Sequence, residues 1–247
     1  MNKEILTNLT KKERRELRRE ERREAQTSQE HTAIYQRIFI WSGVLALLGL
    51  GVFGFVKIAP SLGNGQTAAL ALSVSGEDRI KGNERAEITI VEYSDFQCPA
   101  CAYYQPVVKT ISGEFKDSVR VVYRHFPLPQ HKWAKLAAYA AEAAGNQGKF
   151  WEMVDLIFER QDKWAESDDA APVLYALAQE LGLDMEKFKS DIASDAIKAK
   201  VEKDLASGLT AKIDSTPTFF VNGQKIKNPR SLDDFRQLIN DTLSVKK

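Results

Sequence analysis

The sequence predicts a mixed α/β domain that contains an inserted block of helices and is preceded by one membrane-spanning helix. Three observations lead to this prediction. A charge-free apolar stretch lies near the N-terminus, strand-like and helix-like segments alternate from about residue 81 onward, and the only two cysteines of the 247 residues lie three positions apart at the start of a helical segment. Together these features indicate an anchored domain whose chemistry depends on two thiols.

The first 37 residues form a charged segment that differs from the rest of the chain. Residues 1–37 contain ten Lys and Arg against seven Glu, a net charge of +3, whereas residues 60–247 carry 24 basic and 27 acidic residues, a net charge of −3. A capping box at Thr10 to Glu13 opens a helical pattern whose alternating charges allow i,i+4 pairs. Because the helix has almost no apolar face, we interpret residues 1–37 as a solvated cytoplasmic helix. Contact with nucleic acid or anionic lipid is the weaker alternative, since the charges are mixed, and we expect no nucleic-acid partner.

Residues 38–57 are the predicted transmembrane anchor. Ile38 to Val56 is a run of nineteen residues without a charge, and Trp41 lies near one end of it. A helix of this length, at about 1.5 Å per residue, roughly matches a hydrocarbon core of about 30 Å. A cleaved signal peptide is the alternative, but its apolar part is usually about 7–15 residues long and its charged part is shorter than the one here.

The basic residues also predict the orientation of the anchor. Positively charged flanks stay in the cytoplasm, and the basic residues before the span outnumber the single Lys57 that follows it. The sequence therefore predicts a single-pass protein of the cell membrane with a cytoplasmic N-terminus and an extracytoplasmic catalytic domain. Disulfides persist in that compartment.

A short linker and a strand–helix–strand unit are expected next. Residues 58–80 begin with Pro, Gly and Asn and lack a clear period, which is typical of a linker. In the domain predicted for residues 81–247, residues 87–93 alternate as a strand, a helix runs from the cysteines to about residue 115, and residues 119–124 form a second strand. This order is typical of a parallel crossover.

The sequence after the second strand predicts a helical insertion over about residues 131–213, followed by a hairpin and a helix. Helical spacing fits five segments, roughly 131–145, 148–161, 170–182, 184–193 and 195–213. The dipeptide Asn222-Gly223 between two β-like runs indicates a tight hairpin. A closing helix begins after Ser231, which is a candidate cap.

This order of elements is that of a thioredoxin-like fold with a helical insertion. Three motifs strengthen it, namely residues 90–101 (IVEYSDFQCPAC), 124–128 (RHFPL) and 215–223 (STPTFFVNG), and Pro106 adds a proline five residues after the second cysteine. In these residues the chain resembles the DsbA-like thiol:disulfide oxidoreductases, in particular their membrane-anchored bacterial branch. The resemblance covers about residues 80–245.

The cysteine pair is the candidate catalytic site. A thiolate at a helix N-terminus is stabilised by unpaired N–H groups and the helix dipole, so Cys98 is the expected nucleophile and Cys101 the resolving thiol. Pro99 suits the first helical position. The family often has His where this chain has Ala100, so the resemblance implies a less depressed thiol pKa and a milder oxidant. The alternative, a metal site, lacks the four ligands that structural zinc prefers, and we expect neither a metal nor a cofactor.

The resemblance adds further site residues. It implies that Pro217 is in the cis form, that Thr216 beside it borders the active sulfur and binds substrate, and that Glu92 exchanges a proton with the resolving thiol. An ordinary turn proline and an exposed strand carboxylate are the alternatives, and the period of two allows only one of Glu87 and Glu92 to be buried.

Aromatic residues and a histidine near the cysteines complete the candidates. Phe96 and Phe126 are predicted to contact substrate, with Tyr103, Tyr104 and Trp133 around them, although core positions explain such residues equally well. His125 is more easily explained as a hydrogen-bonded or packed residue than as a metal ligand, and His131 as a surface residue.

We therefore expect a membrane-anchored enzyme that forms disulfides in reduced exported proteins. The resemblance implies a membrane quinone-linked partner that reoxidises it. A reductase or isomerase of the same fold remains possible, because the direction of exchange depends on potential and partner. The non-enzyme alternative is a metallochaperone that binds Cu(I) through the two thiolates and His125.

Overall fold

The computed structural model describes residues 73–244. The predicted cytoplasmic segment, the predicted anchor and residues 58–72 of the predicted linker lie outside the described residues. Between residues 73 and 244, no helix has the length and apolar character needed to cross a bilayer.

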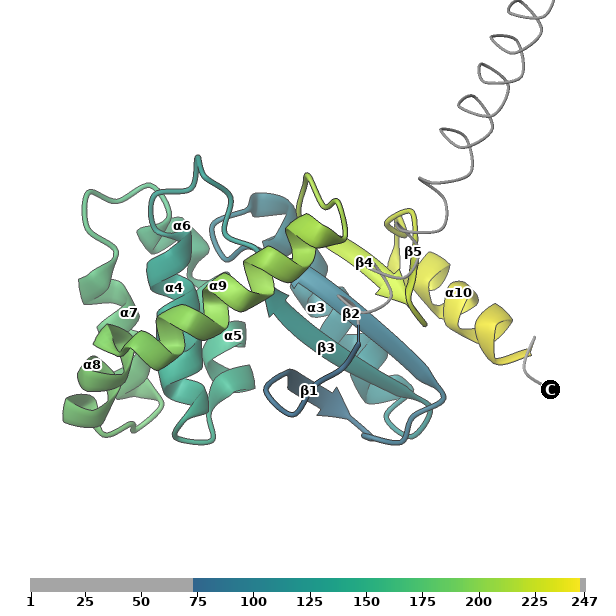
Figure 1. The fold of residues 1–247 in the computed structure, drawn as a ribbon, viewed down its shortest axis with the longest axis horizontal. Coiled ribbons are helices and arrows are strands. Elements are labelled where there is room, and N and C mark those ends of the chain that lie inside the picture. The colour runs from purple at the N-terminus through teal and green to yellow at the C-terminus, as the bar shows by residue number, and fades with distance from the viewer. Residues whose placement is uncertain (1–72, 245–247) are drawn as a thin grey trace, which may run out of the picture. The chain divides into compact units, whose positions relative to one another are not determined.

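A five-stranded sheet forms the centre of the domain (Figure 1). Its strands are β1 (Arg79–Gly82), β2 (Ile88–Ser94), β3 (Val119–His125), β4 (Thr218–Val221) and β5 (Gln224–Lys225), in the order β1-β3-β2-β4-β5. Strands β2 and β3 are parallel, and every other neighbouring pair is antiparallel. The predicted strand–helix–strand crossover is confirmed.

Helices cover both faces of the sheet. On one face, α3 (Pro99–Glu114) and α10 (Leu232–Ser244) bury an apolar cluster that includes Val108, Ile111 and Phe235. The opposite face carries a second cluster, which includes Val91, Val122 and Phe220, next to α9 (Asp195–Thr210) (Figure 1). The alternation of side chains along β2 and β3 produces these two layers.

The helical insertion lies between β3 and β4 and gathers at one end of the sheet (Figure 1). Besides α9 it contains α4 (Ala134–Gly145), α5 (Phe150–Glu159), α6 (Gln161–Trp164), α7 (Ala171–Glu180) and α8 (Met185–Ala193). Its buried side chains form one cluster with Phe96, Tyr123 and both cysteines. The insertion therefore supplies one wall around the cysteine pair.

Two details differ from the sequence-based expectation. Strand β1, whose first two residues fall in the predicted linker, was not expected, because its sequence RIKG contains a single large apolar residue. It forms because the edge of β3 offers free backbone groups, with Arg79 opposite Tyr123. The helix expected over 148–161 ends at Glu159, and α6 starts separately at Gln161.

The C-terminal elements agree with their turn and cap signals. Asn222 and Gly223 have φ angles of 48° and 82°, as a tight primed turn requires. The Ser231 hydroxyl accepts a hydrogen bond from the Asp234 N–H at 3.1 Å, which caps α10.

Candidate active site

The two cysteines lie at the N-terminus of α3. Cys98 is the N-cap residue, with φ −76° and ψ 121°, and Pro99 follows in the first turn. Cys98 is 8% exposed and Cys101, one turn further along, is fully buried. Both are thiols in this structure. The sequence motif therefore produces two sulfurs that differ in their access to solvent.

The surroundings of Cys98 stabilise a negative charge on its sulfur. Hydrogen bonds from the Cys101 thiol, from Thr216 and from the backbone N–H groups of Cys101 and Ala100 lower the pKa of Cys98 to about 5, against the opposing effect of burial. As a thiol, Cys98 donates to the Thr216 carbonyl at 3.4 Å. The buried Thr216 hydroxyl has no partner in this state, so it is available to the thiolate.

Cys101 has the opposite character. Burial, followed by the neighbouring Cys98, raises the pKa of Cys101 well above its usual value. Its Sγ accepts a hydrogen bond of 3.4 Å from the backbone N–H of Asp95. A proton shared by the two sulfurs therefore resides on Cys101, and Cys98 is the reactive thiolate at neutral pH.

Glu92 lies on β2 opposite Tyr123, a member of the cluster that contains both cysteines, and is 1% exposed, whereas Glu87 is exposed. The expectation that only one of the two would be buried is confirmed, and Glu92 is the buried one. Burial raises the pKa of the Glu92 carboxyl to about 7, and the Ser94 hydroxyl partly offsets this effect. Such a carboxyl can give or take a proton near neutral pH.

The loop before β4 lies next to Cys98 through Thr216. The Thr216–Pro217 peptide is cis, as the resemblance implied. The Pro217 carbonyl accepts a hydrogen bond from the Asn228 side chain at 2.8 Å, and the Thr218 hydroxyl donates to the Ser215 carbonyl at 2.7 Å. These bonds hold the loop beside the reactive sulfur.

The structure does not place Phe96 and Phe126 where they could contact a substrate. Phe96 is 1% exposed and stacks on Tyr123, and Phe126 is 3% exposed. Phe126 lies in the cluster on the opposite face of the sheet, against Gly208. The core interpretation is correct for both residues. Of the other aromatic candidates, Tyr103 on α3 is 61% exposed, whereas Tyr104 and Trp133 are partly buried.

Asp95 and His131 form a contact that the sequence analysis missed. The Asp95 carboxylate is buried and accepts hydrogen bonds from the N–H groups of Gln97 and Leu128, both at 2.7 Å. His131 Nδ1 lies 2.7 Å from the same carboxylate, and its side chain is only 18% exposed. The expectation of a surface role for His131 is wrong, because the loop after β3 folds back over the cysteine turn.

Two glutamines join the cysteine turn to the helical insertion. The Gln161 amide donates to the carbonyls of Phe96 and Cys98, at 2.7 and 3.1 Å. Gln97 donates to the Ala165 carbonyl and accepts from the Trp133 N–H. Gln161 starts the short helix α6, and no motif in the sequence marks it.

His125 is buried and hydrogen-bonded, as expected. Its Nε2 lies 2.9 Å from the Glu142 carboxylate on α4, and its ring is 5.8 Å from that of Phe96. Among residues 73–244, no group of three His, Cys, Asp or Glu side chains converges in a way that could hold a metal ion.

Comparison with known proteins agrees with this geometry. The family model described as thioredoxin matches residues 74–241. This chain belongs to the thioredoxin family. Its structural neighbours are DsbA-type thiol:disulfide oxidoreductases, and an arrangement of this type supports thiol–disulfide exchange in general.

Two solved structures illustrate the similarity. Oxidised BdbD from Bacillus subtilis is 26% identical with a TM-score of 0.61, and the match covers 68% of this chain and 94% of that one. The α-DsbA1 protein of Wolbachia pipientis is 21% identical with a TM-score of 0.64, and the match covers 70% and 94% of the two chains. At that lower identity the similarity shows the fold alone.

Curated relatives with higher identity are much longer proteins. The Na⁺/H⁺ antiporter NhaA of Herminiimonas arsenicoxydans is 42% identical over 150 residues, which are 61% of this chain and 23% of the antiporter. NhaA 3 of Salinispora tropica is 38% identical over 157 residues, 63% of this chain and 23% of that protein. The chain thus spans about a quarter of the length of these relatives.

Proposed function

We propose that this protein is a membrane-anchored oxidase that introduces disulfides into reduced exported proteins through Cys98 and Cys101. The observation that carries the proposal is the opposite acidity of the two sulfurs. A stabilised thiolate on Cys98 favours the reduced form of the pair, and this makes the disulfide form an oxidant. A pKa of about 5 lies between the values of about 7 for thioredoxin and about 3.5 for DsbA.

The exchange begins with the disulfide form. A substrate thiolate attacks Cys98 Sγ, the Cys98–Cys101 bond breaks, and its electron pair leaves on Cys101, which takes up a proton. A second thiolate of the substrate then attacks the substrate sulfur of the mixed disulfide, and the electron pair leaves on Cys98, which remains a thiolate at neutral pH. Two substrate thiols become one disulfide, and the enzyme gains two electrons.

The roles of the neighbouring residues follow from their positions. The backbone around Thr216 and cis-Pro217 offers groups for an extended substrate segment beside Cys98. Glu92 supplies the proton that Cys101 takes up. A membrane quinone-linked protein, as the acceptor of the two electrons, regenerates the disulfide.

The reduction potential of the pair tests the direction of the reaction. Equilibration with a glutathione series should give a value between that of a strong oxidant, about −120 mV, and that of an isomerase, about −180 mV. A value near −270 mV would favour the reductase. Purified oxidised protein should also restore a reduced, unfolded test protein to its disulfide-bonded form in stoichiometric amounts.

The anchor and the location belong to the same proposal. They are supported by the nineteen uncharged residues from Ile38 and the basic segment before them. In intact cells, a membrane-impermeant thiol reagent should label Cys98 in the reduced protein. Labelling only after lysis would place the domain in the cytoplasm and exclude the proposed substrates.

Ion transport is not part of the proposal. The antiporter names belong to proteins of which this chain covers only 23%. The matching sequence supports a shared thiol–disulfide exchange domain, and the transport activity of those proteins is assigned to them alone.

A further inference from the structure

A block of four buried polar side chains lies on the α3 face of the sheet. Glu92 and Ser94 are two residues apart on β2, and Tyr123 and His125 are two apart on β3. Glu92 is the register partner of Tyr123, and Ser94 is the partner of His125. Because side chains two apart share a face and paired residues are neighbours, the four form one cluster, here called the polar block. All four are at most 1% exposed.

The polar block contains an unusual concentration of unpaired groups. Six buried side-chain nitrogen and oxygen atoms lack a hydrogen-bond partner within the described part of the chain, and five of them belong to the block. They are both carboxyl oxygens of Glu92, the hydroxyls of Ser94 and Tyr123, and Nδ1 of His125. Buried polar groups are normally paired, so such a concentration in one place points to a role in which the groups change partners.

Cys101 is the part of the active site that this block adjoins. Burial raises the pKa of Glu92, Cys101 and Tyr123, and the Ser94 hydroxyl opposes that rise in all three groups. A hydroxyl both donates and accepts. Ser94 can therefore pass a proton between the sulfur and the remaining members of the block.

His125 connects the block to a carboxylate on α4. The pKa of Glu142 is lowered to about 2 by its hydrogen bonds to His125 and Arg79, against the opposing effect of burial, so the group is a carboxylate and can only accept. His125 Nε2, at 2.9 Å, must then carry the hydrogen of that bond. In the neutral ring Nδ1 is left as an acceptor, without a partner, inside the polar block.

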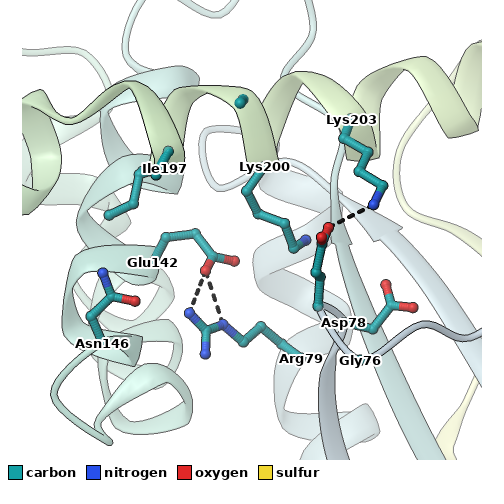
Figure 2. A pocket seen from close by; sticks show the side chains of 11 residues that line it. Gly76, Asp78, Arg79, Glu142, Asn146, Ile197, Lys200 and Lys203 are labelled. Atoms are coloured by element: carbon teal, nitrogen blue, oxygen red, sulfur yellow. Dashed lines mark hydrogen bonds and ion pairs between the residues drawn. The ribbon is translucent and has the colours of Figure 1, made fainter.

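Glu142 continues this connection to the surface. Its second oxygen accepts from the guanidinium of Arg79, whose side chain is 27% exposed. Figure 2 shows this pair in a pocket that also contains Lys200 and Lys203. The path from the buried block therefore ends at an open, charged surface.

The other charged groups around His125 are accounted for. From α9, Asp204 accepts from the His125 backbone N–H at 3.1 Å and is itself paired with Lys200 at 2.6 Å. From α5, the neighbour of the ring is Phe150, which carries no charge. Glu142 is therefore the carboxylate that contacts the imidazole ring directly.

We propose that His125, held by Glu142, is a positioning residue that relays the proton of Cys101. This inference rests on the proposed exchange reaction and extends it. When Cys101 attacks Cys98, its proton passes through Glu92 and the Ser94 hydroxyl to the unpaired Nδ1 of His125, and the Glu142 carboxylate stabilises the imidazolium that forms. When Cys101 later leaves as a thiolate, the imidazolium returns that proton along the same groups.

Such a relay serves a physical need of this site. Cys101 has no exposed surface, and an extended substrate beside Cys98 would cover the open side of the cysteine pair. The pocket that contains Glu142 is lined by residues of β1, α4 and α9 and by the segment that precedes β1, and none of these residues belongs to the cysteine turn. A proton can therefore leave without crossing the bound substrate.

A two-phase reaction with an aromatic disulfide reagent tests the relay. The reduced protein reacts first through the Cys98 thiolate, which releases one aromatic thiol, and Cys101 then displaces the second one. In His125→Asn, whose amide takes the place of the ring's Nδ1 but is not basic, the second phase should slow about tenfold or more, a smaller effect than the about 10²-fold or more of a group that exchanges the proton with the sulfur directly. The pH profile of the first phase should be unchanged.

Matched variants separate the relay from a purely structural effect. Ser94→Ala should slow the second phase in the same way, whereas Ser94→Thr, which keeps the hydroxyl, should stay within about twofold of the wild type. Lys203 lines the same pocket but pairs with Glu77, so Lys203→Gln should leave the rates of both phases unchanged. If His125→Asn does not fold, the Ser94 pair provides the same test.

Two results would overturn the proposal. One is a second phase in His125→Asn and Ser94→Ala that stays within about twofold of the wild type. The other is a parallel shift of both phases, which indicates a distorted turn and not a lost proton path. Because the reagent replaces protein substrates, the outcome does not depend on whether exported proteins are the natural substrates.

Discussion

The two sulfurs of the active site are three residues apart in sequence and occupy opposite environments. Cys98 is the N-cap residue of a helix, remains 8% exposed and receives hydrogen bonds that lower its pKa to about 5. Cys101 is buried, and burial raises its pKa well above the usual value. The sheet beneath it holds polar groups without partners. Cys98 thus carries a negative charge, and Cys101 gains and loses a proton.

This comparison explains why a four-residue motif needs a whole domain around it. The helix terminus accounts for part of the stabilisation of Cys98, but Thr216 comes from a loop 118 residues away. The burial of Cys101 depends on the helical insertion, which shares its apolar cluster. Local sequence therefore determines which sulfur is the more exposed one, and the tertiary structure determines how far the pKa values of the two thiols differ.

The largest effect is expected from removing each sulfur in turn. Cys98→Ser should reduce thiol–disulfide exchange to the background rate, because the thiolate is lost. Cys101→Ala should keep a reactive Cys98 and accumulate mixed disulfides, which non-reducing electrophoresis detects. It should also raise the pKa of Cys98, since the Cys101 thiol is its largest stabilising contact. Cys101→Ser, which retains a donor, should raise it less, and an equal shift in both variants would contradict this assignment.

Glu92→Gln tests the buried side of the comparison. The release of the second thiol, which depends on Cys101, should slow about 10²-fold, the usual contribution of a general acid or base. Cys98 should keep its pH profile, because Glu92 is not among the groups that set its pKa. Stopped-flow absorbance resolves the two phases, and an unchanged second phase would remove Glu92 from the mechanism.

The same variant should change stability in a pH-dependent way. The folded-state pKa of Glu92 is raised to about 7 from 4.5, so its contribution to stability is full below pH 4.5 and is lost as the pH rises through 7. Glu92→Gln avoids that loss and should be more stable than the wild type by roughly 2–3 kcal/mol at pH 8. Urea unfolding of both proteins at pH 4 and pH 8 measures this difference in stability. A gain of the same size at both pH values would contradict the raised pKa of Glu92.

Asp95 contacts both cysteines, and loss of its side chain should have an intermediate effect. Its carbonyl accepts from the Cys98 N–H, its own N–H donates to Cys101, and its carboxylate accepts from two further N–H groups. Asp95→Ala leaves those donors buried and should destabilise the protein by about 2–4 kcal/mol in urea unfolding. His131→Gln, which removes only the ring from the same carboxylate, is the matched control and should cost less than about 1 kcal/mol.

The smallest effect is expected from Ala100, one of the two residues between the cysteines. In Ala100→His, an imidazolium should lower the pKa of Cys98 further and raise the potential by about 30 mV, the equivalent of about one pKa unit for a two-electron couple. Equilibration of both proteins with glutathione measures it, and Ala100→Gln controls for the size of the side chain. An unchanged or lower potential would count against the electrostatic account of Cys98.

The sequence could predict the elements whose signal is local. The alternation of residues 87–93, the helical start at Cys98 and the turn at Asn222-Gly223 all appear in the structure, because short-range backbone preferences determine them. Strand β1 could not be predicted in this way. Its four residues become a strand only through pairing with β3, some forty positions further along.

The residues of the active site likewise divide into those that local sequence marks and those that only tertiary contacts reveal. The cysteine pair and Glu92 could be found from spacing and resemblance, whereas Glu142 could not, because it lies in an alanine-rich helix and gains its role only through contact with His125. The sequence places Phe126 at the substrate surface only as one of several aromatic residues expected to frame a groove around Cys98. The alternation of β3 turns it to the opposite face.

The pH dependence of alkylation at each cysteine tests the central claim most directly. Reduced protein is treated with iodoacetamide from pH 3 to pH 9, and each cysteine is quantified by peptide mass spectrometry. The account predicts that Cys98 becomes reactive with a midpoint near pH 5, and that Cys101 stays unmodified throughout. A Cys98 midpoint at the value of a free thiol, about 8.5, or ionisation of Cys101 before Cys98, would contradict it.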